Sequence, residues 1–222
     1  MIRIAIIGGS GYSGMELVRI LLRHRQADIR RIFARTTAGK KFSEVHPVFA
    51  GRLDRIIESF APEKVDGIDL AFLALPHGES MSIVPALLAA GIKVIDLSGD
   101  FRFPDPGIYE KWYGLPHSAA ACLPDFVYGL PELFRDSIRK ASCVANPGCY
   151  PTASILGLAP LLTMPGIDPG TLIVNALSGV SGAGRKAELA YSFCEVSGSA
   201  RAYKVGTHQH APEIRYYLEK YS

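Results

Sequence analysis

The chain alternates between short apolar runs and segments whose apolar residues recur at helical spacing. Residues 2–7 form a nearly continuous β-branched run, which is typical of a parallel strand buried on both faces. Residues 13–24 place apolar side chains three and four positions apart, which predicts a helix with basic residues in its last turn. Residues 29–34 predict a second strand, so the chain opens with a βαβ unit.

The same alternation continues further along the chain. Strands are predicted at residues 70–75, 94–97 and 142–145, and helices at residues 82–90 and 152–162. Pro85 fits the first turn of a helix better than its interior, so the first of these helices is expected to start late. Strands that alternate with helices form a parallel sheet, and right-handed crossovers place helices on both faces. The predicted fold class is α/β, with a doubly wound, Rossmann-like parallel sheet.

Two later segments break this pattern. Residues 99–133 are rich in Pro, Gly, Tyr and Phe, and we expect a long ordered excursion over the edge of the sheet, a kind of loop that is often functional. Residues 172–177 are expected to begin a second, more β-rich region. The interpretation is two domains, residues 1–148 and an α+β domain at residues 149–222.

Composition and charge exclude several classes of protein. The 222 residues are 48% hydrophobic and 20% charged, which is typical of globular chains and not of disordered ones. Residues 1–60 carry 11 basic and 5 acidic side chains, so this quarter favours an anion, but the clustered basic and aromatic pattern of a nucleic-acid binder is missing. There is neither a signal peptide nor an apolar run long enough to span a membrane. We expect a soluble, reduced, cytoplasmic protein that binds a small molecule.

Glycines fill the turn between the first strand and the first helix. They fit Gly9-x-Gly11-x-x-Gly14 and equally Gly8-x-x-Gly11-x-x-Gly14. Such glycines let the backbone approach a pyrophosphate, whose charge is met by N–H groups at the helix N-terminus. The alternative is an ordinary βα turn, but the order strand, glycines, helix favours a dinucleotide site.

The segment after the second strand indicates which dinucleotide binds. An NAD site expects an acidic residue about 20 positions after the glycines. Here no Asp or Glu lies between Asp28 and Glu44, whereas Arg35, Lys40 and Lys41 do. Cations suit a 2′-phosphate, so NADP is favoured. The alternative is a solvated loop of surface charges.

Cys149 is the most informative of four cysteines, whose spacings fit no zinc site, and a disulfide scaffold is not expected in a chain of this size. It follows a predicted strand and Asn146-Pro147-Gly148, and a helix begins beside it. Unpaired N–H groups at a helix N-terminus stabilise thiolate over thiol, so Cys149 is a candidate nucleophile. The alternative is a small buried apolar residue, which is the interpretation for Cys122, Cys143 and Cys194.

Three further features carry candidate chemistry. His208 and His210 would share one face of an extended segment. No third ligand is identified nearby, so no metal site is predicted. One of the two histidines is expected to act as acid and base for a thiol. The loop of residues 178–186 exposes N–H groups and two cations to an anion, unless it is a flexible turn. Arg102 is expected to pair with a substrate carboxylate or with Asp100.

Seven ordered motifs resemble those of the N-acetyl-gamma-glutamyl-phosphate reductases, a family related to aspartate-semialdehyde dehydrogenase. They are Gly8–Gly14, Leu75–Gly78, Asp96–Arg102, Tyr128–Glu132, Asn146–Thr152, Ser178–Arg185 and His208–Ile214. The resemblance implies that Cys149 attacks an acyl phosphate, that phosphate leaves, and that NADPH reduces the thioester to an aldehyde, with His210 as acid–base partner. It implies substrate contacts by Arg102, Asn146 and His208. It implies cofactor contacts by Gly8, Ser10, Gly11, Tyr12, Ser13, Gly14, Arg35, Thr36, Pro76, Ser181, Gly182 and Ala183. For full-length members it implies a homo-oligomer.

The chain departs from this family in two respects. It ends at Ser222 where members continue, so we expect an incomplete catalytic domain, and Gln209 stands where an arginine is usual. Three alternatives stay open: a related acyl-phosphate reductase of lysine biosynthesis, an inactive NADP-binding fragment, and a Cys–His hydrolase that binds no cofactor.

Overall fold

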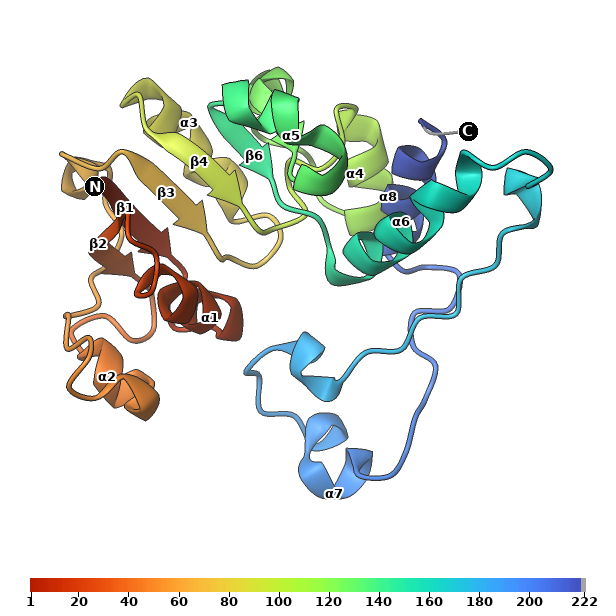
Figure 1. Ribbon diagram of the computed structural model, residues 1–222. Helices are drawn as coiled ribbons and strands as arrows, with labels where there is room; N and C mark the ends of the chain where they lie inside the picture. The colour runs from red at the N-terminus through yellow and green to blue at the C-terminus, as the bar shows by residue number, and fades with distance from the viewer. Residues whose placement is uncertain (221–222) are drawn as a thin grey trace.

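The computed structural model of the chain describes residues 1–220. Its strands form one six-stranded sheet in which every pairing is parallel, in the order β2-β1-β3-β4-β6-β5 (Figure 1). The strands are β1 (Ile2–Ile7), β2 (Ala27–Phe33), β3 (Leu70–Leu73), β4 (Lys93–Asp96), β5 (Phe126–Tyr128) and β6 (Cys143–Ala145). The strand order reverses at β1, so the ends of β1 and β3 form the crevice in which folds of this type bind ligands.

Helices connect these strands and extend beyond them. They are α1 (Tyr12–Leu21), α2 (Phe42–Val45), α3 (Val84–Ala89), α4 (Pro106–Tyr113), α5 (Pro131–Lys140), α6 (Cys149–Leu162), α7 (Phe193–Val196) and α8 (His210–Leu218). As predicted, the helix that contains Pro85 starts late, because a short 3₁₀ turn at Ser80–Ser82 precedes α3.

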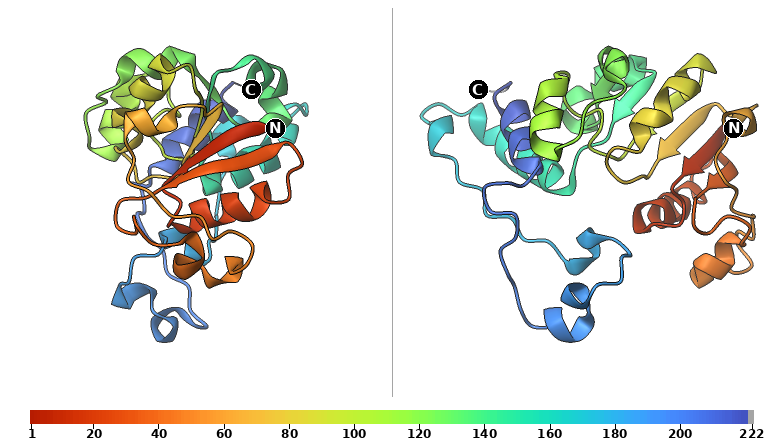
Figure 2. Two further views of the ribbon diagram at one scale, coloured as in Figure 1. Left: turned by 90° about the vertical axis from the view of Figure 1, so that its left-hand side faces the viewer. Right: turned by 180° about the vertical axis from the view of Figure 1, so that it is seen from behind.

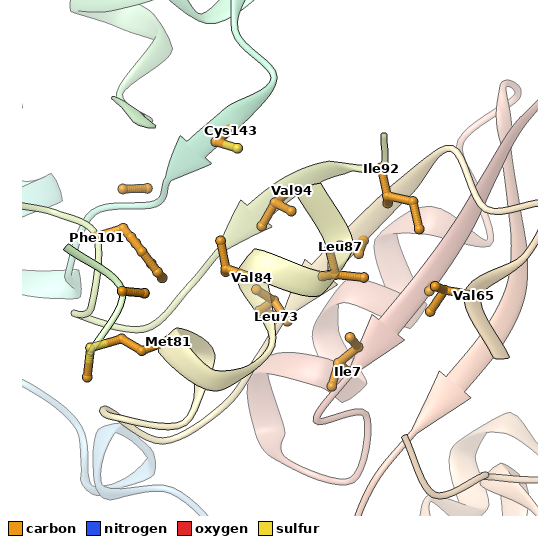
Figure 3. Packing of buried hydrophobic residues seen from close by; sticks show 14 of the residues in the cluster. Ile7, Val65, Leu73, Met81, Val84, Leu87, Ile92, Val94, Phe101 and Cys143 are labelled. Carbon is orange, nitrogen blue, oxygen red and sulfur yellow. The ribbon is translucent and has the colours of Figure 1, made fainter. Parts of the chain in front are cut away.

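Alternate residues of β1 face opposite sides of the sheet and supply two separate cores. Ile4 and Ile6 pack with Val18 of α1, whereas Ile7 packs in a second cluster with Val84 of α3. Figure 3 shows this second cluster, and Figure 1 shows α1 and α3 on opposite sides of the sheet. The doubly wound parallel sheet predicted from the sequence is therefore confirmed.

The excursion at residues 99–133 is more regular than its composition indicates. It contains α4 and the edge strand β5, which pairs with β6 through residues 126–128. Three residues give too little periodicity to be recognised in a sequence, so this strand was not predicted. A third apolar cluster, with Tyr128, Ile155 and Tyr217 among its buried members, joins β5 to α6 and α8.

Residues 163–209 lie away from the sheet and contain only short helical turns in the part of the chain described (Figures 1 and 2). The prediction that residues 172–177 begin a β-rich region is wrong for this structure, because none of residues 1–220 pairs with that segment as a strand. A strand needs a partner for its backbone groups, and without one the apolar side chains of Ile173 and Leu177 stay 85% and 92% exposed.

Candidate active site

The turn between β1 and α1 has the geometry of a dinucleotide-binding turn. Gly8 has φ +93°, and a Cβ there would lie 2.1 Å from the carbonyl oxygen of Ala74, at the end of β3. A Cβ on Gly14 would lie 2.6 Å from the carbonyl oxygen of Gly8. The N-terminus of α1 has no side-chain cap, so its N–H groups are available to an anion. The predicted residues Ser10, Gly11, Tyr12 and Ser13 form this turn.

Arg35 and Thr36 lie just after β2 and are exposed, and their predicted contact with the cofactor stays a prediction. Arg35 Nη1 is 3.9 Å from Glu79 Oε1, a carboxylate that comes from the loop after β3. The hydroxyl of Thr37 is buried and has no hydrogen-bond partner within residues 1–220. No acidic residue lies between Asp28 and Glu44 in the sequence, but the fold brings the carboxylate of Glu79 near Arg35 from another loop.

The glycine turn has two further neighbours that come from distant segments. Arg185 Nη1 donates to the carbonyl oxygen of Ser10 at 2.8 Å, which brings the loop that contains Ser181, Gly182 and Ala183 towards this turn. His46, which is not among the predicted site residues, is buried with its Nε2 3.3 Å from the carbonyl oxygen of Gly9. Burial, together with the charge of Arg185, lowers the pKa of His46 and keeps the ring neutral under the turn.

Cys149 is the first residue of α6, as the strand-to-helix pattern predicts, and it is exposed. It lines a cavity of about 340 Å³ with Tyr150, Ala153, Ser154 and residues 174–178. Of the other cysteines, Cys143 is buried and Cys122 half-buried, but Cys194 is exposed. The interpretation of Cys194 as a buried apolar residue is wrong, because its segment packs against no core in the described structure.

His210 lies against the turn that precedes Cys149. A Cβ added to Gly148 would lie 2.4 Å from His210 Nε2, so only glycine leaves room for the ring. His210 is the first residue of α8 and not part of an extended segment, which corrects the expectation that it shares a strand face with His208. Burial and the neighbouring charge of Arg102 lower the pKa of His210 to about 3, so the ring is neutral at pH 7.

Arg102 pairs neither with Asp100 nor with solvent. Its Nη1 donates to Glu213 Oε2 at 3.1 Å and lies 3.4 Å from His210 Nε2, and both charged side chains are almost completely buried. The remaining guanidinium donors go to the carbonyl oxygens of Asn146 and Leu97. In this arrangement Arg102 positions the turn and the histidine, and its predicted contact with substrate stays a prediction.

Glu213 is the functional candidate that the sequence interpretation missed. Besides Arg102, its carboxylate accepts from the hydroxyl of Tyr128 at 2.8 Å and from the N–H of Gly148 at 3.0 Å. It therefore ties α8 to β5 and to the N-terminus of α6. The signal in the sequence is the spacing His210-x-x-Glu213, which places both side chains on one face of a helix.

Two buried carboxylates hold the loop that contains Pro76. Asp96 accepts from the hydroxyls of Ser80 and Ser98, and burial raises its pKa to about 6. Asp100 accepts from the N–H groups of Gly78 and Ser80. Pro76 is exposed shortly after β3, and its predicted contact with the cofactor stays a prediction. Among residues 1–220, no three His, Cys, Asp or Glu side chains gather to hold a metal ion.

Replacing Gly148 with alanine tests how His210 is seated. Gly148 has φ −65° and ψ 160°, which alanine adopts freely, so the substitution acts only through the clash of its methyl group with the ring. We expect a loss of about 1–3 kcal/mol in the free energy of unfolding, measured by urea denaturation, and displaced His210 NMR signals.

The matched control for this variant is Gly157→Ala in α6, where a Cβ would meet nothing within 4 Å. It is expected to gain about 0.5–1 kcal/mol, because alanine favours a helix over glycine. A loss of stability in both variants, or in neither, contradicts the clash at Gly148.

A parallel α/β sheet with a glycine turn at its switch point defines the class of Rossmann-like dinucleotide-binding folds, and here an exposed cysteine follows at a helix N-terminus, with a histidine against the residue before it. Family models agree with this class. The model "Semialdehyde dehydrogenase, NAD binding domain" matches residues 3–141, and "Semialdehyde dehydrogenase, dimerisation domain" matches residues 149–222. The chain belongs to the semialdehyde dehydrogenase family, and residues 3–141 match the NAD-binding domain of that family.

Curated relatives are named N-acetyl-gamma-glutamyl-phosphate reductase, which confirms the resemblance found in the motifs. The protein from Desulforudis audaxviator is 49% identical over 96% of this chain and 62% of its own length. The protein from Desulfotalea psychrophila is 50% identical over 99% of this chain and 64% of its own length. The chain thus spans less than two thirds of the length of these relatives.

Solved structures agree on the fold. Aspartate semialdehyde dehydrogenase with NADP from Candida albicans has a TM-score of 0.55 at 16% identity, over 73% of this chain and 47% of that one. Aspartate semialdehyde dehydrogenase II from Vibrio cholerae has a TM-score of 0.52 at 21% identity, over 72% and 45%. In the described residues, no helix has the length and apolar character needed to cross a membrane.

Proposed function

We propose that the chain takes part in the NADPH-dependent reductive dephosphorylation of N-acetyl-gamma-glutamyl phosphate to N-acetyl-glutamate semialdehyde, a step of arginine biosynthesis. The observation that carries the proposal is the position of Cys149, exposed at the start of α6, with the ring of His210 against the preceding residue. The names of relatives about 50% identical supply the substrate.

The residues around the crevice fit a dinucleotide phosphate. The uncapped N-terminus of α1 would hold the pyrophosphate, and Arg35 with Thr36 would hold the 2′-phosphate. Pro76 and residues 181–183 would border the nicotinamide half. Bound NADPH supplies the hydride that reduces an acyl group.

The chain's own residues account for the acyl transfer. The thiol of Cys149 gives its proton to neutral His210, and the sulfur attacks the acyl carbon. The bond from that carbon to the phosphate oxygen breaks, inorganic phosphate leaves and takes up a proton from solvent, and a thioester remains on Cys149. After reduction the carbon–sulfur bond breaks, the aldehyde is released, and His210 returns the proton to the sulfur. Asn146 and His208 would orient the substrate beside Cys149.

We further propose that residues 1–148 form the NADP-binding domain and residues 149–222 the catalytic domain. Full-length relatives are proposed to assemble as homo-oligomers, which fits a second domain of the dimerisation type. The exposed apolar side chains of residues 172–177 support this assignment, because surfaces of that kind usually contact another chain.

The phosphate-dependent oxidation of N-acetyl-glutamate semialdehyde, followed by NADPH absorbance, tests the function. We expect NADPH formation that requires inorganic phosphate and NADP. Turnover only with a carrier-linked acyl phosphate favours the lysine-pathway reductase, and NADPH binding without turnover favours a binding fragment. Thioester hydrolysis without cofactor binding favours a hydrolase.

Replacing Arg35 with alanine is expected to weaken NADPH binding about tenfold and to leave NADH binding unchanged. A hydrogen bond to a charged group contributes about 1.5–3 kcal/mol, and solvent and salt screen the exposed Arg35 side chain, so the lower end of that range applies. The measurement is a fluorescence titration with each coenzyme. Arg30→Ala is the control, because Arg30 pairs with Asp28 on β2. Equal losses for NADPH and NADH would rule out recognition of the 2′-phosphate by Arg35.

A further inference from the structure

A row of polar groups leads from the backbone of α8 to the cavity beside Cys149. The N–H of His210 donates to Nδ1 of His208 at 3.0 Å. Nε2 of His208 is 3.3 Å from the hydroxyl of Tyr203, and that hydroxyl donates to the hydroxyl of Tyr150 at 2.9 Å. Tyr150 follows Cys149 in α6 and lines the same cavity.

The donors and acceptors in this row have one consistent direction. A backbone N–H can only donate, so Nδ1 of His208 is an acceptor and carries no proton. Burial and the charge of Lys204 lower the pKa of His208, so the ring is neutral and its single proton sits on Nε2. That proton points to Tyr203, whose own proton goes to Tyr150. The hydroxyl of Tyr150 accepts within the row, so its proton is left to donate elsewhere.

The cavity beside Tyr150 has the size and the uncharged lining to hold a small molecule that accepts this hydrogen bond. It is lined on one side by Cys149, Tyr150 and Ser154 and on the other by residues 174–178, and its volume of about 340 Å³ accommodates a small acyl compound. None of its lining residues is charged. The guanidinium of Arg102, which lies close to His210, is buried and paired with Glu213. A neutral donor on a residue that lines such an uncharged cavity suits a carbonyl oxygen.

We propose that Tyr150 is a substrate-binding residue whose hydroxyl donates a hydrogen bond to a carbonyl oxygen of the acyl substrate held beside Cys149, and that Tyr203 and His208 are the positioning residues that direct this hydroxyl. The inference rests on the proposed function for the identity of the substrate. The hydrogen bond itself is independent of the proposed function, because the Tyr150 hydroxyl would donate to any small carbonyl compound in the cavity.

Tyr150→Phe removes the donor and keeps the ring. One neutral hydrogen bond is worth about 0.5–1.5 kcal/mol, so kcat/KM for N-acetyl-glutamate semialdehyde is expected to fall about three- to tenfold, mainly through KM, with an unchanged KM for NADP. Tyr203→Phe removes the hydroxyl that donates to Tyr150, so the Tyr150 hydroxyl is no longer held in one orientation. We expect a smaller fall in kcat/KM, again mainly through KM. Tyr191→Phe, in the same segment but outside the row, is the control and is expected to match the wild type.

A second measurement requires no turnover. Iodoacetamide carries a carbonyl next to its reactive carbon, and peptide mass spectrometry reports alkylation of each cysteine separately. Tyr150→Phe is expected to slow alkylation of Cys149 about three- to tenfold relative to exposed Cys194. The pH dependence of that rate is expected to stay unchanged, and buried Cys143 reports any unfolding.

The outcomes separate the two proposals. If the wild type does not turn over the semialdehyde but Tyr150→Phe slows alkylation of Cys149, the proposed function fails and the hydrogen-bond donor stands. Equal rates of alkylation in Tyr150→Phe and wild type overturn the role of Tyr150. A shifted pH profile also overturns it, because Tyr150 would then act on the thiol and not on the carbonyl.

Discussion

Cys149→Ser is expected to lower kcat/KM for semialdehyde oxidation at least about a thousandfold while NADPH binds as in the wild type. The serine hydroxyl keeps the shape of the side chain, but at neutral pH it is a far weaker nucleophile than a thiol, so the covalent step fails. The glycine turn proposed to hold the cofactor lies between β1 and α1, far along the chain from Cys149 at the start of α6. Initial rates and a fluorescence titration with NADPH measure the two effects separately.

The chain provides a matched control for this substitution. Cys194 is the other exposed cysteine among residues 1–220, and it does not line the cavity beside Cys149. Cys194→Ser is therefore expected to keep full activity. Mass spectrometry of the wild type trapped during turnover is expected to show the acyl group on the peptide that contains Cys149. An active Cys149→Ser variant, or an acyl group on another peptide, contradicts the assignment of the nucleophile.

Local features of the site could be predicted from the sequence because each is built within a few residues. The glycine turn after β1 and the position of Cys149 at the start of α6 depend on a strand, a turn and a helix that are consecutive in the chain. The two covered faces of the sheet followed from the nearly continuous apolar run of β1 and from the alternation of strands with helices. These patterns are short in range, so a single sequence contains them.

The contacts that complete the site could not be predicted, because they join distant segments. Arg102 was expected to pair with Asp100 or with substrate, yet it pairs with Glu213, 111 residues further along. Glu79 approaches Arg35 from another loop, and Arg185 reaches Ser10 across 175 residues. A charged residue has many candidate partners in a sequence, and only the packing of the fold selects one of them.

The buried pair of Arg102 and Glu213 is expected to dominate the stability of the region that carries the site. Glu213→Gln keeps the size of the side chain but leaves the guanidinium uncompensated in the interior, which costs about 3–5 kcal/mol when one partner of a buried ion pair is removed. The loss is measured as the free energy of unfolding from urea denaturation. A Glu213→Gln protein within 1 kcal/mol of the wild type would contradict this expectation.

A double variant distinguishes a missing charge from a disturbed shape. Arg102→Met with Glu213→Gln removes both charges, and exchanging a buried pair for neutral side chains is often close to neutral in stability. We therefore expect the double variant to be more stable than Glu213→Gln alone, although the carbonyl oxygens of Leu97 and Asn146 lose their donor. Additive losses would show that the two charges are not coupled. The carboxylate of Glu213 also accepts from Gly148 and Tyr128. Glu213→Gln is therefore expected to weaken the packing of α8 on α6 and to make the position of the His210 ring beside Gly148 less well defined.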